Sequence, residues 1–586
     1  SFRKGTVRPF REPEYFDIAA REVRGALEAD LKRPFYIDNN VGGDQMLADY
    51  FKQETARLER EGIVCINKPA DWEVREDELR RQLHEMLGLD PLPEKTDLQA
   101  VVTGKVEHED FIVENIHFQS RPGLYVTGNL YVPKKIDKPL PAVLYVCGHG
   151  QGKKDGIAYG AKAHYQHHGG WFARNGYVCL TIDTLQLGEI EGIHHGTYKY
   201  DMWWWLNRGY TPAGVEAWNC IRALDYLQSR KEVDGDKLGV TGRSGGGAYS
   251  WWIAAIDKRI KCAVPTAGTT DMQNHVVDGV VEGHCDCMFM VNTYRWDYPQ
   301  VAMMVAPRPL LIANTDRDPI FPLDGVYRTF LEVRPLYAKL NAKDNVGLNI
   351  TFGGHNDTQD LQVHAFRWLN KHLKGVDVQV DKTVEKFFQP EQLKVFAKLP
   401  EDQKNTTIHE TFVPEAKVAL PKDAESWKAW KREAVDFLKS RSFRAWPDAP
   451  AELDLQEVTK VENDGIKLTV SEFTSQEGIR LQLWTMHRAD LKDPQINVLN
   501  VLDDQAWTEF QRLLRRPFAK EFELEPPSVN DFLAWDSTKQ MLTKFPWVMS
   551  YVAPRGVGPT AFDQSQKKQI QNRRRFSLLG QTLDGM

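Results

Sequence analysis

The sequence predicts an α/β fold, in which helices cover both faces of a mostly parallel β-sheet. Continuous apolar runs of strand length occur at Pro141 to Cys147 and Tyr177 to Ile182, as expected of strands that are buried on both faces. A helix-like segment between them ends at Arg174, and a longer helix from Pro212 to Leu227 follows the second run. Strands that alternate with helices in this way form parallel sheets.

The alternation continues to residue 375, which sets the extent of this domain. Further strands are predicted at residues 237–240, 260–264, 309–313 and 346–352. An amphipathic helix over 361–373 then ends at Gly375, because glycine is the common C-terminal cap of a helix. Ahead of the parallel part, residues 111–118 and 124–132 are predicted to pair as antiparallel strands around a Pro-Gly turn.

At 586 residues the chain is too long for one hydrophobic core. Changes in its composition and predicted secondary structure divide it into four parts. Residues 1–95 are predicted to be a helical N-terminal cap. Residues 96–375 are the α/β domain, and residues 376–455 are a helical connector. The fourth part covers residues 456–586 and repeats the α/β domain.

The repeat is visible as matching segments at nearly constant offsets. Segments 123–126 and 140–146 recur 355 positions later. Two further blocks recur at offsets of 370 and 371: Val178, Ile182 and Gly188 as Val548, Val552 and Gly558, and Gly209, Thr211 and Gly214 as Gly580, Thr582 and Gly585. The second copy is therefore predicted to be a partial unit, and its interruption at Met586 leads us to expect that the native chain continues.

Composition limits the classes of function. A net charge of -6 gives no electrostatic basis for binding nucleic acid. No run of 18 apolar residues occurs, so no membrane span is expected. Seven scattered cysteines do not form a disulfide framework, and no metal or cofactor motif is found, since His284 to Cys287 lacks a matching distant pair. The chain opens on Ser1 rather than Met, which suggests processing and favours a secreted or periplasmic location. The oligomeric state is left open.

The segment from Gly242 to Gly246, Gly-Arg-Ser-Gly-Gly, is predicted to be a nucleophile elbow. A strand precedes it and an apolar helix over 248–256 follows, so Ser244 would sit in a tight strand-to-helix turn. A serine hydroxyl becomes a useful nucleophile when a base accepts its proton and donors stabilise the oxyanion. The elbow predicts an α/β-hydrolase fold with Ser244 as its nucleophile.

The acid and base of a catalytic triad should follow later strands, in that order. Asp318 lies in the loop after the strand at 309–313, and His355 lies after the last strand. His355 would accept the Ser244 proton, and Asp318 would hold the correct tautomer of its ring. Asp316, in the same loop, and Asp271, after an earlier strand, are alternatives to Asp318 as the acid.

The oxyanion hole is predicted to use the backbone N–H of Gly245 and the loop that holds His149 and Gly150. That loop reads Gly-His-Gly in the first copy. The second copy has Asp503, Asp504 and Gln505 instead, and carboxylates would repel an oxyanion. We therefore expect no complete active site in the second copy.

Three residues are candidates for contact with substrate. Trp203 and Trp296 lie in segments predicted to overhang the strand ends, where aromatic rings can stack on sugars, although tryptophans also fill cores. Arg243, beside the nucleophile, is the third candidate. The expected partner is a small-molecule or carbohydrate ester.

These motifs resemble those of the acetyl xylan esterase and dienelactone hydrolase branch of the α/β-hydrolases, often called prolyl-oligopeptidase-like. The resemblance rests on the elbow, on Ala306 to Ile312, on Asp318 to Pro322, and on Gly353 to His355. It implies a serine esterase with no cofactor that removes acyl groups such as acetyl from polysaccharide or oligosaccharide. The long N-terminal region and the partial repeat depart from the family pattern.

Three other readings remain open. Glucuronoyl esterases are similar in outline but place an arginine after the serine, whereas Arg243 precedes it. A peptidase of the prolyl oligopeptidase clan would bring a β-propeller, and no blade-like repeat is found in the sequence. A non-catalytic scaffold built on two hydrolase-like sheets is the third alternative.

Overall fold

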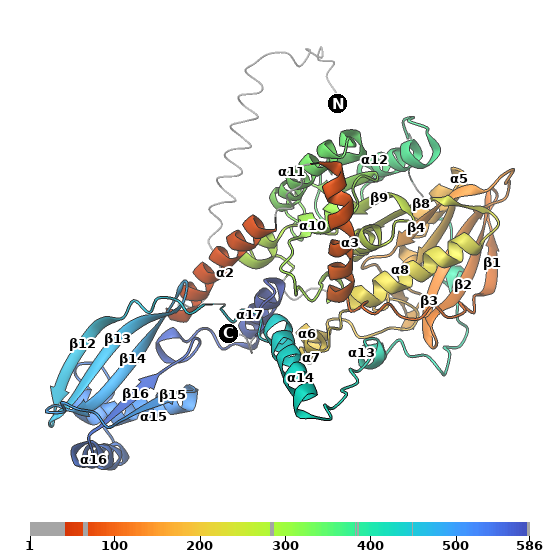
Figure 1. Cartoon of the computed structure of the whole chain (residues 1–586). Coiled ribbons are helices and arrows are strands. Elements are labelled where there is room, and N and C mark those ends of the chain that lie inside the picture. The colour runs from red at the N-terminus through yellow and green to blue at the C-terminus, as the bar shows by residue number, and fades with distance from the viewer. Residues whose placement is uncertain are drawn as a thin grey trace, which may run out of the picture. The chain divides into compact units, whose positions relative to one another are not determined.

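The structure is a computed structural model (Figure 1). It describes residues 42–62, 68–281, 286–380, 383, 386–447 and 449–582. The chain forms two compact units. The larger holds the described parts of residues 48–452, 475–478 and 564–582, and the smaller holds residues 42–47, 453–474 and 479–563. Within the described residues, no helix is both long and apolar enough to cross a bilayer.

These units differ from the four predicted parts. Most of the predicted connector and the last described residues belong to the larger unit. The described part of the predicted N-terminal cap contains two helices, α2 (Gly42–Glu61) and α3 (Pro69–Met86), followed by a non-helical segment to residue 95. Residues 1–41 of that cap lie outside the described residues.

Within the described residues, the larger unit is built on a sheet of nine strands in the order β1-β2-β3-β7-β4-β8-β9-β10-β11. The first three pairs are antiparallel and the other five are parallel. The strands are β1 (Val101–Glu107), β2 (Phe111–Arg121), β3 (Leu124–Pro133), β4 (Leu140–Val146), β7 (Val178–Ile182), β8 (Val233–Arg243), β9 (Ile260–Thr266), β10 (Leu310–Thr315) and β11 (Val346–Thr351). The predicted mostly parallel sheet is confirmed.

Helices pack against this sheet. Alternate side chains of β4, Val143 and Tyr145, share one hydrophobic cluster with α5 (Gln166–Arg174) and α12 (Gln359–Leu369). Helices α8 (Pro212–Ser229) and α9 (Gly245–Ile256) pack against β4 and β8. Buried side chains thus surround the parallel strands. The C-terminal ends of these strands lie at one edge of the sheet, which is where sheets of this kind bind ligands.

The smaller unit is built on a five-stranded sheet in the order β12-β13-β14-β16-β15. Its strands are β12 (Gln456–Asn463), β13 (Ile466–Gln476), β14 (Ile479–Arg488), β15 (Ile496–Val501) and β16 (Trp547–Val552). This is the order of the first five strands of the larger sheet, β1-β2-β3-β7-β4. The pairs β12–β13 and β14–β16 are antiparallel and the pair β16–β15 is parallel, as in their counterparts.

The two sheets also agree in register. Val101 pairs with His117 in β1 and β2, and adding 355 to both positions gives Gln456 and Glu472, which pair in β12 and β13. Both first strands carry an irregularity at the same place, two residues into the ladder. An irregularity at matching positions in both copies is a feature of the repeated unit and not a local defect.

The change of offset from 355 to 370 has a structural cause. Gly128 pairs with Ile182, and the corresponding pair in the second sheet is Leu483 with Val552, at offsets of 355 and 370. Between β15 and β16 the smaller unit carries two helices, α15 (Asp504–Phe518) and α16 (Val529–Lys544), where the larger unit has shorter helices. The sequence repeat is therefore a repeat of structure with a longer helical crossover.

The described residues of the third repeated block lie in the larger unit. Helix α17 (Gln566–Leu578) and helix α7 (Trp204–Asn207) are each followed by a glycine with φ of 72°, Gly580 and Gly209. In both places the next residue donates its N–H to the carbonyl five positions earlier, at 2.9 and 2.8 Å. The C-terminal ends of α7 and α17 thus share the same hydrogen-bonded turn, and both helices belong to the larger unit.

Candidate active site

Ser244 lies at the predicted strand-to-helix turn, between β8 and α9. Its backbone has φ of 59° and ψ of -121°, a strained conformation for a residue with a side chain. The turn fits because its neighbours are glycines: a Cβ on Gly246 would lie 2.0 Å from the carbonyl oxygen of Val146. The serine hydroxyl is thereby presented at the C-terminal edge of the sheet.

His355 connects Ser244 to Asp318. The Nε2 atom of His355 lies 3.0 Å from Oγ of Ser244, and its Nδ1 lies 2.7 Å from Oδ2 of Asp318. The other oxygen of Asp318 accepts the backbone N–H groups of Ile320 and Phe321 at 2.9 and 3.1 Å. Asp318 is buried, and because its remaining oxygen is already satisfied, its Oδ2 is left to orient the His355 ring.

The two alternative acids contact other groups. Asp316 accepts the backbone N–H of Gly353 at 2.8 Å, which ties the loop before His355 to the end of β10. Asp271 forms an ion pair with Arg328. Of the three aspartates, Asp318 is the one in hydrogen-bonding contact with His355.

The predicted oxyanion loop passes close to the elbow. A Cβ on Gly148 would lie 2.0 Å from the carbonyl oxygen of Arg243 and 3.1 Å from the backbone nitrogen of Gly245. Gly150 packs against the ring of His164. In the second copy the equivalent Asp503 caps helix α15 by accepting the N–H of Ala506 at 2.7 Å, so its chain turns directly into a helix.

His149 in this loop forms a contact that the sequence did not predict. Its Nε2 atom lies 2.9 Å from Nε2 of His194, in the segment that follows β7. Its carbonyl oxygen accepts the hydroxyl of Tyr165 at 2.8 Å. The ring and carbonyl of His149 are thus held, which fixes the backbone that would face an oxyanion.

The three predicted substrate contacts are in different surroundings. Trp203 lines a pocket together with other aromatic and apolar side chains. Trp296 is 2 % exposed and its indole N–H bonds to Gln82, so it packs inside the unit. Arg243 lies in a second, smaller cavity with Tyr145 and His168.

The Trp203 pocket has four aromatic side chains and an ion pair in its wall. Its lining residues include Trp205, Tyr210 and Phe289. The guanidinium of Arg574 on α17 lies 4.5 Å from the Phe289 ring centre and 3.4 Å from Asp286. In the chain, Trp203 to Pro212 come after β7 and Asp286 to Met290 come after β9.

A buried ionic cluster supports the segments after β4 and β7. The ammonium of Lys162 donates to Asp183 and Glu189, both at 2.7 Å, and to the carbonyl of Tyr159 at 2.8 Å. None of the three charged side chains is more than 2 % exposed. Burial opposes the charge on Lys162, but the two carboxylates outweigh it and raise the Lys162 pKa.

The Lys162→Met variant is expected to lose about 3–5 kcal/mol of unfolding free energy, because two buried carboxylates would lose their cation. Urea unfolding at pH 7 measures the loss. Lys153→Met is the matched control: the exposed Lys153–Glu191 pair, at 2.8 Å, should contribute at most about 1 kcal/mol. Equal losses in the two variants would contradict the assignment.

Glu216 on α8 is fully buried and accepts the backbone N–H of Leu185. Burial raises its pKa to about 8. An acid whose pKa is higher in the folded state stabilises the fold below its unfolded pKa of about 4.3. That stability is lost as the pH rises towards 8.

The Glu216→Gln variant is expected to lose less stability than the wild type between pH 5 and pH 8, since glutamine does not ionise and keeps an acceptor for Leu185. Thermal unfolding of both proteins across this range measures the difference. Parallel pH curves for the two proteins would show that Glu216 does not titrate in this window.

Comparisons with known proteins agree with the fold. Residues 164–375 match the model of the prolyl oligopeptidase family. YtaP of Bacillus subtilis, which is named as a hydrolase, is 28% identical over 301 residues, covering 50% of this chain and 99% of YtaP. YuxL of the same organism, named as a peptidase, is 24% identical over 281 residues, covering 46% of this chain and 40% of YuxL.

Similar solved structures include several esterases. A methylesterase is 21% identical, with a TM-score of 0.42, over 69% of this chain and 81% of the other. A glucuronoyl esterase from Solibacter usitatus is 16% identical, with a TM-score of 0.42, over 52% of this chain and 94% of the other. An acetyl xylan esterase from Paenibacillus is 17% identical, with a TM-score of 0.38, over 54% and 99%.

The larger unit therefore contains an α/β-hydrolase domain. Its residues 164–375 are prolyl-oligopeptidase-like, and the chain is similar to a protein named as a hydrolase. The predicted fold class and the prolyl-oligopeptidase-like resemblance are confirmed.

Proposed function

We propose that the chain is a serine carboxylic-ester hydrolase with Ser244 as nucleophile, His355 as base and Asp318 as the orienting acid. The observation that carries the proposal is the pair of hydrogen bonds made by His355, at 3.0 Å to Ser244 and 2.7 Å to Asp318. Together with the left-handed backbone of Ser244, this arrangement is what acyl transfer through a serine requires.

The proposed reaction has two halves. In the first, Oγ of Ser244 bonds to the acyl carbon while Nε2 of His355 accepts the hydroxyl proton. The ester C–O bond breaks, and His355 gives that proton to the departing alcohol oxygen. In the second half, water loses a proton to His355 and attacks the acyl-enzyme, which releases the acid and restores Ser244.

The oxyanion formed in each half would accept hydrogen bonds from backbone N–H groups. We assign these to Gly245 and to the loop at His149 and Gly150. Support comes from the close approach of that loop, since a Cβ on Gly148 would lie 3.1 Å from the Gly245 nitrogen. Donors held by a rigid loop are effective because they need no reorganisation during the reaction.

The proposed substrate class is an acylated polysaccharide or oligosaccharide, with acetyl as the example acyl group. The aromatic pocket beside Trp203 supports it, because flat aromatic walls suit sugar rings and apolar groups. Arg243 and Trp296 are not assigned to this surface, since Arg243 lies in another cavity and Trp296 is packed in the core.

A peptidase is the second candidate, and the family match and the YuxL likeness favour it. In the described residues, every strand belongs to sheets of nine, five or two strands, and none forms a propeller blade. A non-catalytic scaffold is less well supported, because such a role does not require the hydrogen bond between His355 and Ser244.

One screen separates these candidates. The full chain is assayed on acetylated xylan, a methyl glucuronate ester, aryl acetates and a prolyl-peptide amide, and is labelled with a fluorophosphonate whose site is mapped by mass spectrometry. We expect ester hydrolysis and label on Ser244. Amide cleavage without ester cleavage would support the peptidase, and absence of both turnover and label would support the scaffold.

A further inference from the structure

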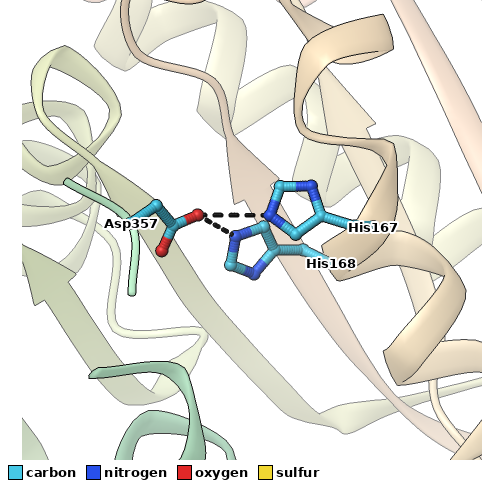
Figure 2. A group of neighbouring side chains, drawn as sticks. All are labelled: His167, His168 and Asp357. Atoms are coloured by element: carbon cyan, nitrogen blue, oxygen red, sulfur yellow. Dashed lines mark hydrogen bonds and ion pairs between the residues drawn. The ribbon is translucent and has the colours of Figure 1, made fainter. Parts of the chain in front are cut away.

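Three side chains outside the proposed triad, His167, His168 and Asp357, point toward one another (Figure 2). One carboxylate oxygen, Oδ2 of Asp357, lies 2.8 Å from Nε2 of His168 and 3.2 Å from Nε2 of His167. The histidines are neighbours on helix α5, and Asp357 lies two residues beyond His355 in the loop between β11 and α12. The cluster joins the loop of the proposed base to a helix on the sheet.

The other side of that loop is tied elsewhere. Gly353 donates its N–H to Asp316 at 2.8 Å, and its carbonyl oxygen accepts the N–H of Arg317 at 3.0 Å. The Gly354 carbonyl accepts the hydroxyl of Thr315 at 2.8 Å. His355 therefore sits between an upstream anchor on β10 and a downstream anchor made by Asp357.

The cluster is held rigidly on the helix side. The ring of His168 stacks on Tyr145 of β4, with ring centres 4.3 Å apart, and contacts Phe366 of α12 edge-on at 5.8 Å. His168 is 7 % exposed and Asp357 is 15 % exposed. The two imidazoles outweigh the effect of burial and hold the pKa of Asp357 well below its usual range, so its carboxylate is ionised at neutral pH.

A hydrogen-bonded anchor fits this cluster better than a metal centre. The Nδ1 atoms of His167 and His168 are buried and have no hydrogen-bond partner in the described part of the chain. A metal on Nε2 would force the proton onto Nδ1, where metal-binding histidines almost always have an acceptor. With Nε2–H donated to Asp357, both ring protons are satisfied and the carboxylate gains two donors.

We propose that Asp357, held by His168 and His167, is a positioning residue that keeps His355 within hydrogen-bonding distance of Ser244. The inference rests on the proposed function, because it assigns Asp357 a role through the base of that reaction. A displacement of about 1 Å at a reacting group can cost about a hundredfold in rate. The loss of the downstream anchor should therefore appear in kcat more than in KM.

The first test compares Asp357→Asn with Asp360→Asn, an exposed acid at the start of α12. We expect Asp357→Asn to lower kcat and the rate of fluorophosphonate labelling by about 10–100-fold, with KM changed less than about threefold. The downfield proton resonance of the His355–Asp318 hydrogen bond should shift or broaden. Asp360→Asn should match the wild type in kcat, KM, labelling rate and proton resonance.

A matched pair at His168 separates positioning from simple loss of stability. His168→Gln keeps an N–H donor for Asp357, and His168→Phe keeps the ring on Tyr145 but has no donor. We expect the Phe variant to lose at least about tenfold in kcat and the Gln variant to stay within about threefold of the wild type.

Three results would overturn the inference. The first is wild-type kcat in folded Asp357→Asn protein, even with a lowered Tm, and the second is equal kcat in the two His168 variants. The third is stoichiometric Zn²⁺ binding that is lost in Asp357→Asn, since the cluster would then be a metal centre. If the wild-type protein is not labelled at Ser244, the proposed function itself fails and the inference fails with it.

Discussion

The Ser244→Ala variant is expected to lose about 10⁶-fold in kcat on the best ester found in the screen. Alanine removes the only oxygen that can bond to the acyl carbon, and His355 and Asp318 cannot replace it. In serine hydrolases a nucleophile-to-alanine change costs about this much, and the remaining acceleration of about 10³–10⁴-fold over water comes from the oxyanion hole and substrate binding. Steady-state kinetics with purified variant measure the loss.

The same variant controls for folding. Serine and alanine both have a Cβ, so the strain at φ of 59° is the same and the elbow should form in both. The Tm should change by no more than a few degrees, and fluorophosphonate labelling should disappear. Retained turnover in well-folded Ser244→Ala protein would mean that another residue is the nucleophile.

Much of the fold was predictable because the patterns that define it are local. The strands β4, β7 and β10 follow continuous apolar runs, which their short length marks as buried strands. The repeat was predictable because matching offsets survive in the sequence, and the paired strands keep the same register in both sheets. A register is hard to change, since a one-residue slip would turn every side chain to the wrong face.

The site was predictable in outline because the nucleophile, the acid and the base of this fold follow particular strands in a fixed order along the chain. Ser244, His355 and Asp318 are joined by hydrogen bonds in the structure, while their catalytic roles remain predictions. The contact between His149 and His194 could not be predicted, because the two residues lie on loops from different strands. Trp296 had the sequence context of a surface aromatic, yet long-range packing against Gln82 places it in the core.

The second copy shows how such a unit diverges. Its five strands keep the order and register of the first copy, so the sheet itself has been preserved. The loop after β15 has become the first turn of a helix, with Asp503 as its cap. A capping carboxylate stabilises the helix start but places negative charge where the first copy brings backbone towards Gly245.

The Asp318→Asn variant is expected to lower kcat by about 10⁴-fold, and the structure gives the reason. Oδ1 of Asp318 accepts the N–H groups of Ile320 and Phe321, so an asparagine would keep its amide oxygen at that position. Its NH₂ would then face Nδ1 of His355 and force the ring proton onto Nε2. In that tautomer His355 cannot accept the Ser244 proton, and a change of this kind in a related triad costs about 10⁴-fold.

Asp316→Asn is the matched control for that variant. Asp316 lies two residues earlier in the same loop, and an asparagine there keeps an acceptor for the N–H of Gly353. We expect its kcat to stay within about threefold of the wild type, because the loop anchor survives and the tautomer of His355 does not change. Full activity in Asp318→Asn together with a large loss in Asp316→Asn would assign the triad acid to Asp316. Equal and large losses would show instead that the loop as a whole, rather than the carboxylate on His355, sets the rate.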